Sequence, residues 1–458
     1  MPQRNFMVMA VVLVVFLASR VHGFILDTNL DPCQYESTAI YCYNQNLTSI
    51  PVFNLTRYAN VCITLINLSS NKLTSIENDA FLQLRYLNCS YTIQLGKNNM
   101  SQINEYAFRG IEPHIDSLML SSNSLRSLPE AVGSIINLKT LFLQRNPIMS
   151  LNPSVMAKIG NSLITFFVGM ASFQQWPREL RFLNELYQLG LNDIPFQSWD
   201  SDAFHGLTHV GWLEITSSNL TKIPNAVCAL SALYSIHIRN NYFLNESKSD
   251  VFEPCSPITG TPRLGIVTYT DNRVDYFPNI FTMFPSVNTV YMSHNDMRFM
   301  NANKFEDNFI VETLSLHSNQ FRRIPSGFNI FRNLKQLDLG SNFIENIEDN
   351  DLIGLRSLTS IQLAYNPIQF IEKRAFQNNM QLNSVDLSHT FLTTVPAAVT
   401  ILPALKTLGL EANNIECTCD LASLKTWNVY SMQINGLCYL TNEPIETFIK
   451  TYIDAGKR

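Results

Sequence analysis

The stretch Leu334-Lys-Gln-Leu-Asp-Leu-Gly-Ser-Asn-Phe-Ile344 decides the fold, because its pattern L-x-x-L-x-L-x-x-N-x-L recurs almost from end to end of the chain. The preceding copy begins at Val311 and the next at Leu358, which are 23 and 24 residues away from Leu334. A fixed period of this length predicts a solenoid of stacked repeats. We expect positions 1, 4, 6 and 11 of each copy to point inward, and positions 2, 3, 5, 7 and 8 to face solvent.

Fifteen copies align in one register. Their first positions are Ile63, Ser90, Ile115, Leu138, Leu163, Leu186, Val210, Leu233, Leu264, Val287, Val311, Leu334, Leu358, Leu382 and Leu405. Eleven copies carry asparagine at position 9, where a buried side-chain amide can hydrogen-bond backbone groups of neighbouring repeats as a ladder. The other four carry Ala171, Ile194, Ser218 and Thr390, so the sequence predicts a ladder that is interrupted in the middle of the array.

The segments that link one strand to the next are of two kinds. One kind carries proline soon after position 11, as in Leu128-Pro129, and proline favours an extended or tight-turn return. The other carries an Ala-Phe pair, as in Ala107-Phe108, which suits a short helical turn. With the repeated pattern, both kinds resemble the typical extracellular class of leucine-rich repeat proteins. The resemblance implies an α/β solenoid shaped like a horseshoe, with a parallel concave sheet, about fifteen repeats and a cap at each end.

Cysteines mark the amino-terminal end of the array. Cys33 and Cys42 look like the cysteines of an amino-terminal cap, and we expect them to form a disulfide. A cap is required because the first strand of a solenoid otherwise exposes an apolar face and an unpaired edge. Cys62 and Cys89 each precede position 1 of successive copies, so parallel stacking would bring them to about 4.8 Å, near the bridging range.

Two further cysteine groups lie later in the chain. Cys228 and Cys255 lie on the convex halves of adjacent copies, at a step of 31 residues between the first positions 233 and 264. A disulfide between them would tie down the insertion around residues 245–262, and two buried free thiols are the alternative. The final cysteines, with Leu424 and Trp427, are similar to the family's carboxy-terminal cap. By that resemblance Cys417 pairs with Cys438. The family's fourth cysteine is missing, which leaves Cys419 either as part of an eroded cap or as the link in a covalent homodimer.

The amino terminus predicts secretion. Arg4 precedes an apolar run over residues 7–18, and Val21-His22-Gly23 supplies small or short residues for cleavage, as in a signal peptide. The run is too short to span a bilayer, and an uncleaved anchor is the alternative. We therefore divide the chain into a signal peptide (1–23), an amino-terminal cap (24–62), leucine-rich repeats (63–416) and a carboxy-terminal cysteine-containing cap (417–458). No later apolar run has spanning length.

Glycosylation acceptors agree with a secreted, extracellular chain. Sequons of the form N-x-S/T occur at Asn46, Asn54, Asn67, Asn88, Asn99, Asn219 and Asn245. The formal net charge of -5 and the lack of a Lys/Arg cluster argue against a nucleic-acid partner. The sequence also contains no hydrolase, metalloprotease or phosphate-loop motif, so it predicts no catalytic residues, no cofactor and no metal.

Two groups of outward side chains are candidates for binding. The first is apolar and comprises Met119, Phe142, Phe167, Met170 and Trp212. Successive outward aromatics would form a patch that marks an interaction site, although scattered apolar side chains on a surface are ordinary. The second is polar and comprises His237, Arg239, Asp271, Tyr291, His294 and His317. A metal or pH-sensing role is one interpretation of this second group, and a solvated polar surface without ligand is the other.

These patterns favour a secreted recognition protein that binds a protein or glycan on its concave face, in immunity or cell-surface signalling. The alternative is a structural matrix protein like the small proteoglycans of the family, whose amino-terminal cap has a denser four-cysteine cluster than this chain provides. Sequons crowd the amino-terminal end of the sheet, and glycans there would shield it from a partner. Aromatic and arginine side chains, which most often carry the binding energy of an interface, lie further along. We therefore expect the binding surface on repeats 4 to 11, formed by Phe142, Phe167, Trp212, Glu214, His237, Arg239, Tyr291 and His317.

Overall fold

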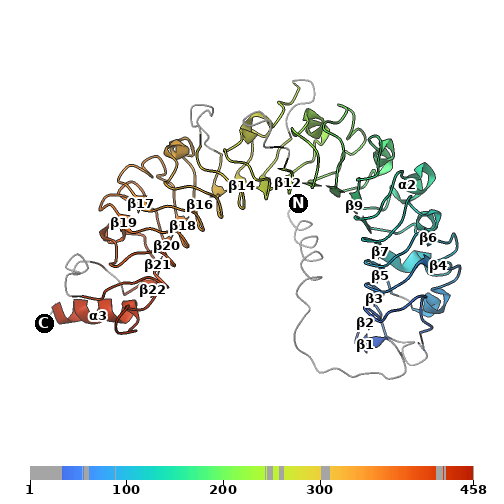
Figure 1. Cartoon of the computed structure of the whole chain (residues 1–458), viewed down its shortest axis with the longest axis horizontal. Helices are drawn as coiled ribbons and strands as arrows, with labels where there is room; N and C mark the ends of the chain where they lie inside the picture. Colours follow the sequence, from blue (N-terminus) through green and yellow to red (C-terminus); the bar gives the residue numbers. More distant parts are fainter. Residues whose placement is uncertain are drawn as a thin grey trace.

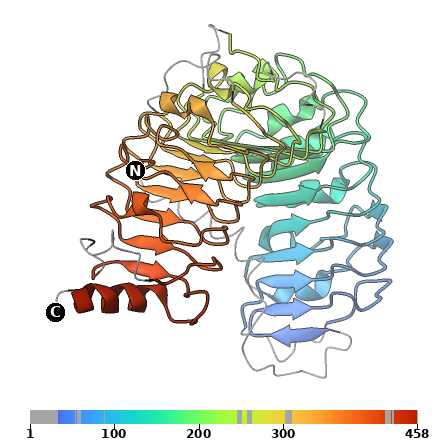
Figure 2. The ribbon, with the colours of Figure 1, turned by 60° about the vertical axis from the view of Figure 1, so that its left-hand side comes forward.

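The computed structural model describes residues 33–53, 55, 61–87, 89–242, 244, 251–256, 262–300, 310–418, 427 and 430–456. They form an arched solenoid, with strands along the inner side of the arch and turns and short helices along the outer side (Figure 1). A view turned by 60° shows the strands stacked along each arm, with helix α3 (Ile445–Gly456) at the end of the carboxy-terminal arm (Figure 2). The predicted leucine-rich repeat solenoid with a parallel concave sheet is therefore confirmed.

One sheet of eighteen strands lines the concave side. It begins with β1 (Gln34–Glu36), which is antiparallel to β2 (Ala39–Tyr41). From β2 onward the strands are parallel and follow chain order: β3 (Leu65–Asn67), β5 (Tyr91–Gln94), β7 (Ile115–Met119), β8 (Thr140–Leu143), β9 (Thr165–Gly169), β10 (Gln188–Asn192), β11 (Trp212–Thr216), β12 (Ser235–Arg239), β13 (Ile266–Thr270), β14 (Thr289–Tyr291), β15 (Thr313–Ser315), β16 (Gln336–Asp338), β18 (Ser360–Gln362), β20 (Ser384–Asp386), β21 (Thr407–Gly409) and β22 (Gln433–Asn435).

The outer side is built from shorter elements. Two small parallel pairs lie on the flank, β4 (Ser75–Ile76) with β6 (Gln102–Ile103) and β17 (Asn346–Ile347) with β19 (Phe370–Ile371). The helix α2 spans Pro153–Ile159, with Asn152 as its capping residue. The described 3-10 helices are Leu82–Tyr86, Glu112–His114, Glu130–Ser134, Arg178–Phe182, Asn225–Ala229, Ile280–Thr282, Ser326–Ile330 and Ala397–Val399. Proline precedes several of them and supplies an extended entry, as at Pro129.

The core runs continuously through the arch, as the repeat pattern predicts. In the copy that begins at Leu334, the side chains at positions 1, 4, 6 and 11 are all buried, including Leu339 and Ile344. The copies above and below place Leu316 and Leu363 beside Leu339, and both are fully buried. Each repeat thus completes its apolar core only by contact with its neighbours.

The register departs from the pattern in the second copy. The prediction that Ser90 points inward is wrong, because Ser90 is exposed and the next residue, Tyr91, is fully buried. Tyr91 pairs with Ile115, and the pairing shifts by one residue between Tyr91 and Thr92. A bulge of this kind re-aims side chains. Burying an aromatic ring is more favourable than burying a serine, which explains the direction of the slip.

The asparagine ladder forms as expected. The side-chain amide of Asn342 donates to the carbonyl oxygens of Leu316 and Leu339, both at 3.0 Å, and its oxygen accepts from the backbone N–H of Phe321 at 3.1 Å. The same three kinds of bond recur at Asn146 and at Asn319. Each buried amide therefore joins its own repeat to the preceding one and satisfies backbone groups that water does not reach.

The predicted interruption of the ladder is narrower than the four substitutions suggest. The hydroxyl of Ser218 donates to the amide oxygen of Asn241 at 2.6 Å, and the hydroxyl of Thr390 donates to that of Asn413 at 2.5 Å. Ile194 is buried and has no polar group to contribute. In the copy before it, Ala171 is exposed, while its neighbour Met170 is fully buried. The ladder is therefore interrupted between Asn146 and Ser218.

Four disulfides join the cysteine pairs expected from the sequence: Cys33 with Cys42, Cys62 with Cys89, Cys228 with Cys255 and Cys417 with Cys438. Their Cα–Cα distances run from 4.3 Å to 5.7 Å, within the usual range for bridged cysteines or at its lower edge. Cys419 and Leu424 lie outside the described residues, as do the predicted signal peptide at 1–23 and much of the insertion at 245–262.

The carboxy-terminal cap closes the solenoid in two ways. Strand β22 adds to the edge of β21 and carries the sheet one strand past the last repeat. Helix α3 then covers the open end of the core, with Ile445 and Ile449 fully buried. Trp427 is buried as well, in agreement with the role that the family resemblance implies. The spacing of the two isoleucines by four residues is a helix signal in the sequence.

Candidate binding surface on the concave sheet

The in-register strands place one row of outward side chains along the middle of the concave sheet. The row consists of Asn67, Gln94, Met119, Phe142, Phe167, Gly190, Glu214, His237, Thr268, Tyr291, Ser315, Asp338, Gln362 and Asp386. Neighbouring strands are about 4.8 Å apart, so consecutive members of the row are within reach of each other.

Four rings in this region form a continuous stack. The ring centroids of Phe142 and Phe167 are 4.9 Å apart, those of Phe167 and Trp212 are 5.6 Å apart, and those of Trp212 and His237 are 4.7 Å apart. All four side chains are half-buried. We call Phe142, Phe167, Trp212 and His237 the aromatic stack. It presents a solvent-accessible apolar surface that crosses the strands from β8 to β12.

Gly190 makes the stack continuous. Phe167 lies on β9 and Trp212 on β11, so the two rings must meet across the intervening strand β10. A Cβ atom at Gly190 would lie 2.1 Å from Cδ1 and 2.7 Å from Cγ of Phe167, which is far inside contact distance. The ring of Phe167 thus occupies the space that a side chain at position 190 would take. Gly190 is not among the residues predicted from the sequence, where its only signal is a glycine at an outward position of a strand.

His237 is held as a neutral imidazole at the end of the stack. A guanidinium nitrogen of Arg239 lies 3.4 Å from Nδ1, and the hydroxyl of Ser235 lies 2.9 Å from Nε2. Arginine can only donate, so Nδ1 accepts, and Nε2 carries the proton that it donates to Ser235. Burial, and then the charge of Arg239, lower the pKa of His237 to about 4. We therefore expect His237 to remain neutral near pH 7.

Arg239 sets a fixed positive charge beside the aromatic stack. Its guanidinium is half-buried, and its Nε is buried without a hydrogen-bond partner in the part of the chain that the structure describes. Glu214 lies next to His237 in the row and accepts from the hydroxyl of Thr216 at 3.0 Å. The stack thus has one cationic side chain, Arg239, and one anionic side chain, Glu214, beside it at this end. Both side chains are half-buried.

The remaining candidates form a second group. Tyr291 is 39% exposed and is separated from His237 along the row by Thr268, which is buried. Nδ1 of His317 lies 3.6 Å from Oδ1 of Asp338, and the rings of His294 and His317 are 6.0 Å apart. The eight predicted binding residues therefore divide into a tight group around the stack and a looser group on later strands.

Two interpretations that the sequence suggested do not hold in the structure. Met170 does not face outward, because it is fully buried at position 8 of its repeat, while Ala171 at the asparagine position is exposed. The polar group does not form a metal site either, since no cluster of three or more His, Cys, Asp or Glu side chains among the described residues could hold an ion. Asp271 and His294 both adopt positive φ after the carboxyl ends of β13 and β14, and the backbone N–H of Asp271 donates to the carbonyl of His294 at 3.0 Å.

The described sequons differ in exposure. Asn46, Asn99 and Asn219 are exposed. Asn67 is half-buried near the amino-terminal end of the row, and its side-chain oxygen accepts from the backbone N–H and the hydroxyl of Ser69. Asn54, Asn88 and Asn245 lie outside the described residues.

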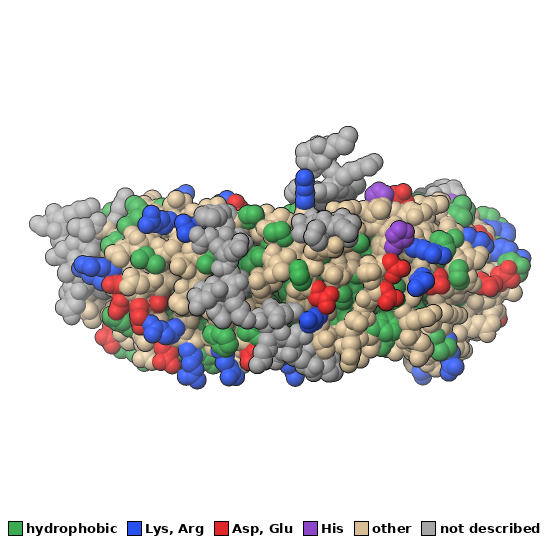
Figure 3. Space-filling model, turned by 90° about the horizontal axis from the view of Figure 1, so that it is seen from above, with side chains coloured by type: hydrophobic (Ala, Val, Ile, Leu, Met, Phe, Trp, Pro, Cys, Tyr) green, Lys and Arg blue, Asp and Glu red, His purple; other side chains and the backbone are tan. Residues whose placement is uncertain are grey.

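Viewed from its convex side, the molecule shows basic and acidic side chains interspersed among uncharged ones (Figure 3).

We expect the stability of the protein to fall between about pH 6.5 and pH 4 through His237. The unfolded chain binds a proton at this histidine below pH 6.5, whereas the folded chain does not until about pH 4. Stability is therefore lost as pH falls through this window, and the loss stops below it. His237→Gln, which can keep both hydrogen bonds, should reduce this loss. Free energies of unfolding measured by urea titration at several pH values test it, and parallel curves for parent and variant would contradict it.

The family models match two parts of the chain. The model described as "Leucine rich repeat" matches residues 311–368 and 356–415, and the model described as "BspA type Leucine rich repeat region (6 copies)" matches residues 53–176. Both matches fall on the repeats and their immediate surroundings. No described helix is long and apolar enough to cross a membrane.

Similar proteins cover much of the chain at low identity. Podocan from Mus musculus is 23% identical over 424 residues, which are 82% of this chain and 63% of podocan. Toll-like receptor 3 from Homo sapiens is 26% identical over 310 residues, which are 65% of this chain and 31% of the receptor. The chain thus spans less than two thirds of both relatives. The structure of the Toll–Spatzle complex from Drosophila superposes with a TM-score of 0.59 at 16% identity, covering 89% of this chain and 58% of that chain, and it shows the same fold.

Proposed function

We propose, on the premise that this chain belongs to the extracellular leucine-rich repeat family, that it is a secreted recognition protein whose concave sheet binds a protein or glycan. The aromatic stack carries this proposal. Side chains in contact across five strands form a contiguous apolar surface, whereas scattered apolar residues would carry no such meaning. The relatives include a protein named as a receptor, which agrees with a binding role.

The chemistry of the surface favours a ligand that combines a flat apolar group with an acidic one. Trp212 and Phe167 offer ring faces for stacking. Arg239 is always charged and only half-buried, and it forms no ion pair within the described residues, so its charge is available to a carboxylate or a sulfate. Tryptophan, tyrosine and arginine are also the residues that most often dominate binding energy. We assign the contact surface to Phe142, Phe167, Trp212, Glu214, His237 and Arg239, with Tyr291 and His317 at its carboxy-terminal side.

The test begins with capture of partners on the tagged mature chain from extracellular fluid of the source organism. A triple variant with alanine at Trp212, Arg239 and Tyr291 should fail to retain the partner. With the purified partner, its affinity should fall by about a hundredfold or more, since hot-spot residues each contribute about 2 kcal/mol. The matched control carries alanine at Gln336, Gln362 and Thr407, which lie on the concave face of β16, β18 and β21. It should bind as the parent does.

A second control concerns the glycans. Asn67→Gln removes the sequon in the row without touching the stack, and binding should persist. If the alanine variant binds as the parent does, and removal of the amino-terminal glycans abolishes binding, the binding surface lies at the other end of the sheet.

A further inference from the structure

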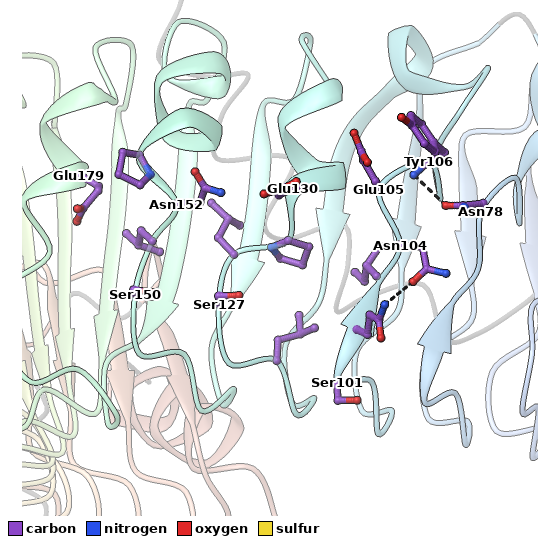
Figure 4. A pocket seen from close by; sticks show the side chains of 17 residues that line it. Asn78, Ser101, Asn104, Glu105, Tyr106, Ser127, Glu130, Ser150, Asn152 and Glu179 are labelled. Atoms are coloured by element: carbon purple, nitrogen blue, oxygen red, sulfur yellow. Dashed lines mark hydrogen bonds between the residues drawn. The ribbon is translucent and has the colours of Figure 1, made fainter.

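A groove opens on the outer flank of the amino-terminal repeats (Figure 4). None of its lining residues belongs to the aromatic stack. It has a volume of about 820 Å³. Its lining comes from five successive repeats, from Asn78 in the first to Glu179 in the fifth. We call it the flank groove and define it by Asn78, Gln102, Glu105, Ser127, Glu130 and Glu179.

The groove exists because the flank strands stop pairing at one place. Strand β6 pairs with β4 on one side, and Ser127 pairs with Ser150 in the next two repeats. Within the described chain no pairing joins β6 to Ser127. A few residues earlier the same two repeats are still joined, because the backbone N–H of Ser124 donates to the carbonyl oxygen of Met100 at 2.8 Å. The repeat types change at this point, from the helical-turn kind at Ala107-Phe108 to the proline kind at Pro129. The two backbones therefore diverge, and the edge of β6 borders the groove.

The lining has one sign of charge. None of its seventeen residues is lysine or arginine, whereas Glu105, Glu130 and Glu179 all belong to it. Figure 4 shows these three carboxylates spaced along the groove on separate repeats. None of the three forms an ion pair within the described residues. The nearby Arg109 does not neutralise them, because it is paired with Asp79.

The three carboxylates are spaced apart, so they favour a ligand that carries several separate cationic groups. Among the described residues no three acidic side chains converge closely enough to hold a metal ion. An extended peptide, however, presents alternate side chains on one face and its backbone groups at the edge. Peptides of this kind bind exposed sheet edges through main-chain hydrogen bonds, while their side chains provide specificity.

From this geometry we propose that the flank groove binds an extended peptide segment rich in lysine or arginine, donated by a partner protein. The backbone of the segment adds to the free edge of β6 at Gln102 and Ile103. Its basic side chains pair with Glu105, Glu130 and Glu179. The groove is thus a second docking site, independent of the concave surface and acting by charge complementarity.

The test uses a fluorescein-labelled dodecapeptide of alternating lysine and threonine, titrated with the folded chain and followed by fluorescence anisotropy. The triple variant Glu105→Gln, Glu130→Gln and Glu179→Gln should bind about tenfold more weakly, since each exposed ion pair contributes modestly. A matched variant with Glu185→Gln, Asp202→Asn and Glu411→Gln loses the same charge at exposed positions outside the groove and should bind as the parent does. Parent and variants are assayed with and without N-linked glycans, because Asn99 lies two residues from Ser101 in the lining.

Two further probes separate backbone pairing from general attraction. The same peptide with N-methylated backbone should bind more weakly, because it cannot donate to β6. A glutamate–threonine peptide should not bind. Equal losses in the groove variant and the matched variant, equal binding of the two peptides, or no binding of the lysine peptide to the parent would each overturn the proposal. Melting temperatures confirm that each variant is folded, and a destabilised triple variant is replaced by its single substitutions.

Discussion

Replacing Leu339 by aspartate should unfold the repeats around it. Leu339 is fully buried, and its carbonyl accepts hydrogen bonds from the side chains of both Asn342 and Asn366. A carboxylate at this place would lie in a dry core between two leucine-lined repeats, at a cost of about 5 kcal/mol or more. The free energy of unfolding of a native domain is only about 5 to 15 kcal/mol, so this loss is comparable to the entire stability. Thermal melts followed by circular dichroism should show an earlier and less cooperative transition.

The control for Leu339→Asp lies on the same strand. Gln336 is exposed on the concave face of β16, so Gln336→Asp adds the same charge without burying it. It should change the stability by less than about 0.5 kcal/mol. A melt of Leu339→Asp at the parent temperature with parent cooperativity would show that the assigned register is wrong.

Gly190→Ala should break the aromatic stack and destabilise the protein by about 1 to 3 kcal/mol, because the new methyl group overlaps the ring of Phe167. The nearest contacts include Cγ of that ring, at 2.7 Å, so rotation of the ring tip cannot relieve the overlap. Phe167 must leave its rotamer and lose its contact with Trp212. Binding of a ligand to the concave surface should weaken with it.

A double-mutant cycle tests this explanation without any ligand. In a Phe167→Ala background the overlap is gone, so Gly190→Ala should become neutral or even stabilising by a few tenths of a kcal/mol to about 1 kcal/mol. Urea unfolding of the parent, the two single variants and the double variant gives the coupling free energy between the two substitutions. Equal costs of Gly190→Ala in both backgrounds would mean that the glycine is required for another reason. Gly133→Ala serves as a control, because its added methyl group would meet only side-chain and backbone atoms at 3.3 Å or more.

The repeat pattern predicts the buried face of the arch well, because many copies fix one register. Leu334 and Leu339 are buried as positions 1 and 6 require. The errors occur at single residues, at Ser90, where the strand register shifts by one residue, and at Met170, which is buried at a position expected to face outward. A slip of one residue moves a side chain from solvent to core, and a pattern averaged over copies does not contain that information.

The candidate site was only partly visible in the sequence. The outward positions of Phe142 and Trp212 follow from the period alone, but their connection through Phe167 depends on the empty space at Gly190. The neutral state of His237 depends on its burial and on Arg239, which periodicity does not reveal. The flank groove depends on which outer segments fail to pair, and this property belongs to the three-dimensional arrangement of the backbone.

Between Asn146 and Ser218 no position-9 asparagine links one repeat to the next. The stability of a solenoid is a sum of repeat terms and nearest-neighbour terms, so weak interfaces divide it into separate cooperative units. The aromatic stack crosses this boundary on the concave side, from Phe142 in β8 to His237 in β12. A ligand that lies on the stack touches both units, and part of its binding free energy becomes a coupling between the two arms. Occupancy of the concave surface then determines whether the arch responds to stress as one body or as two.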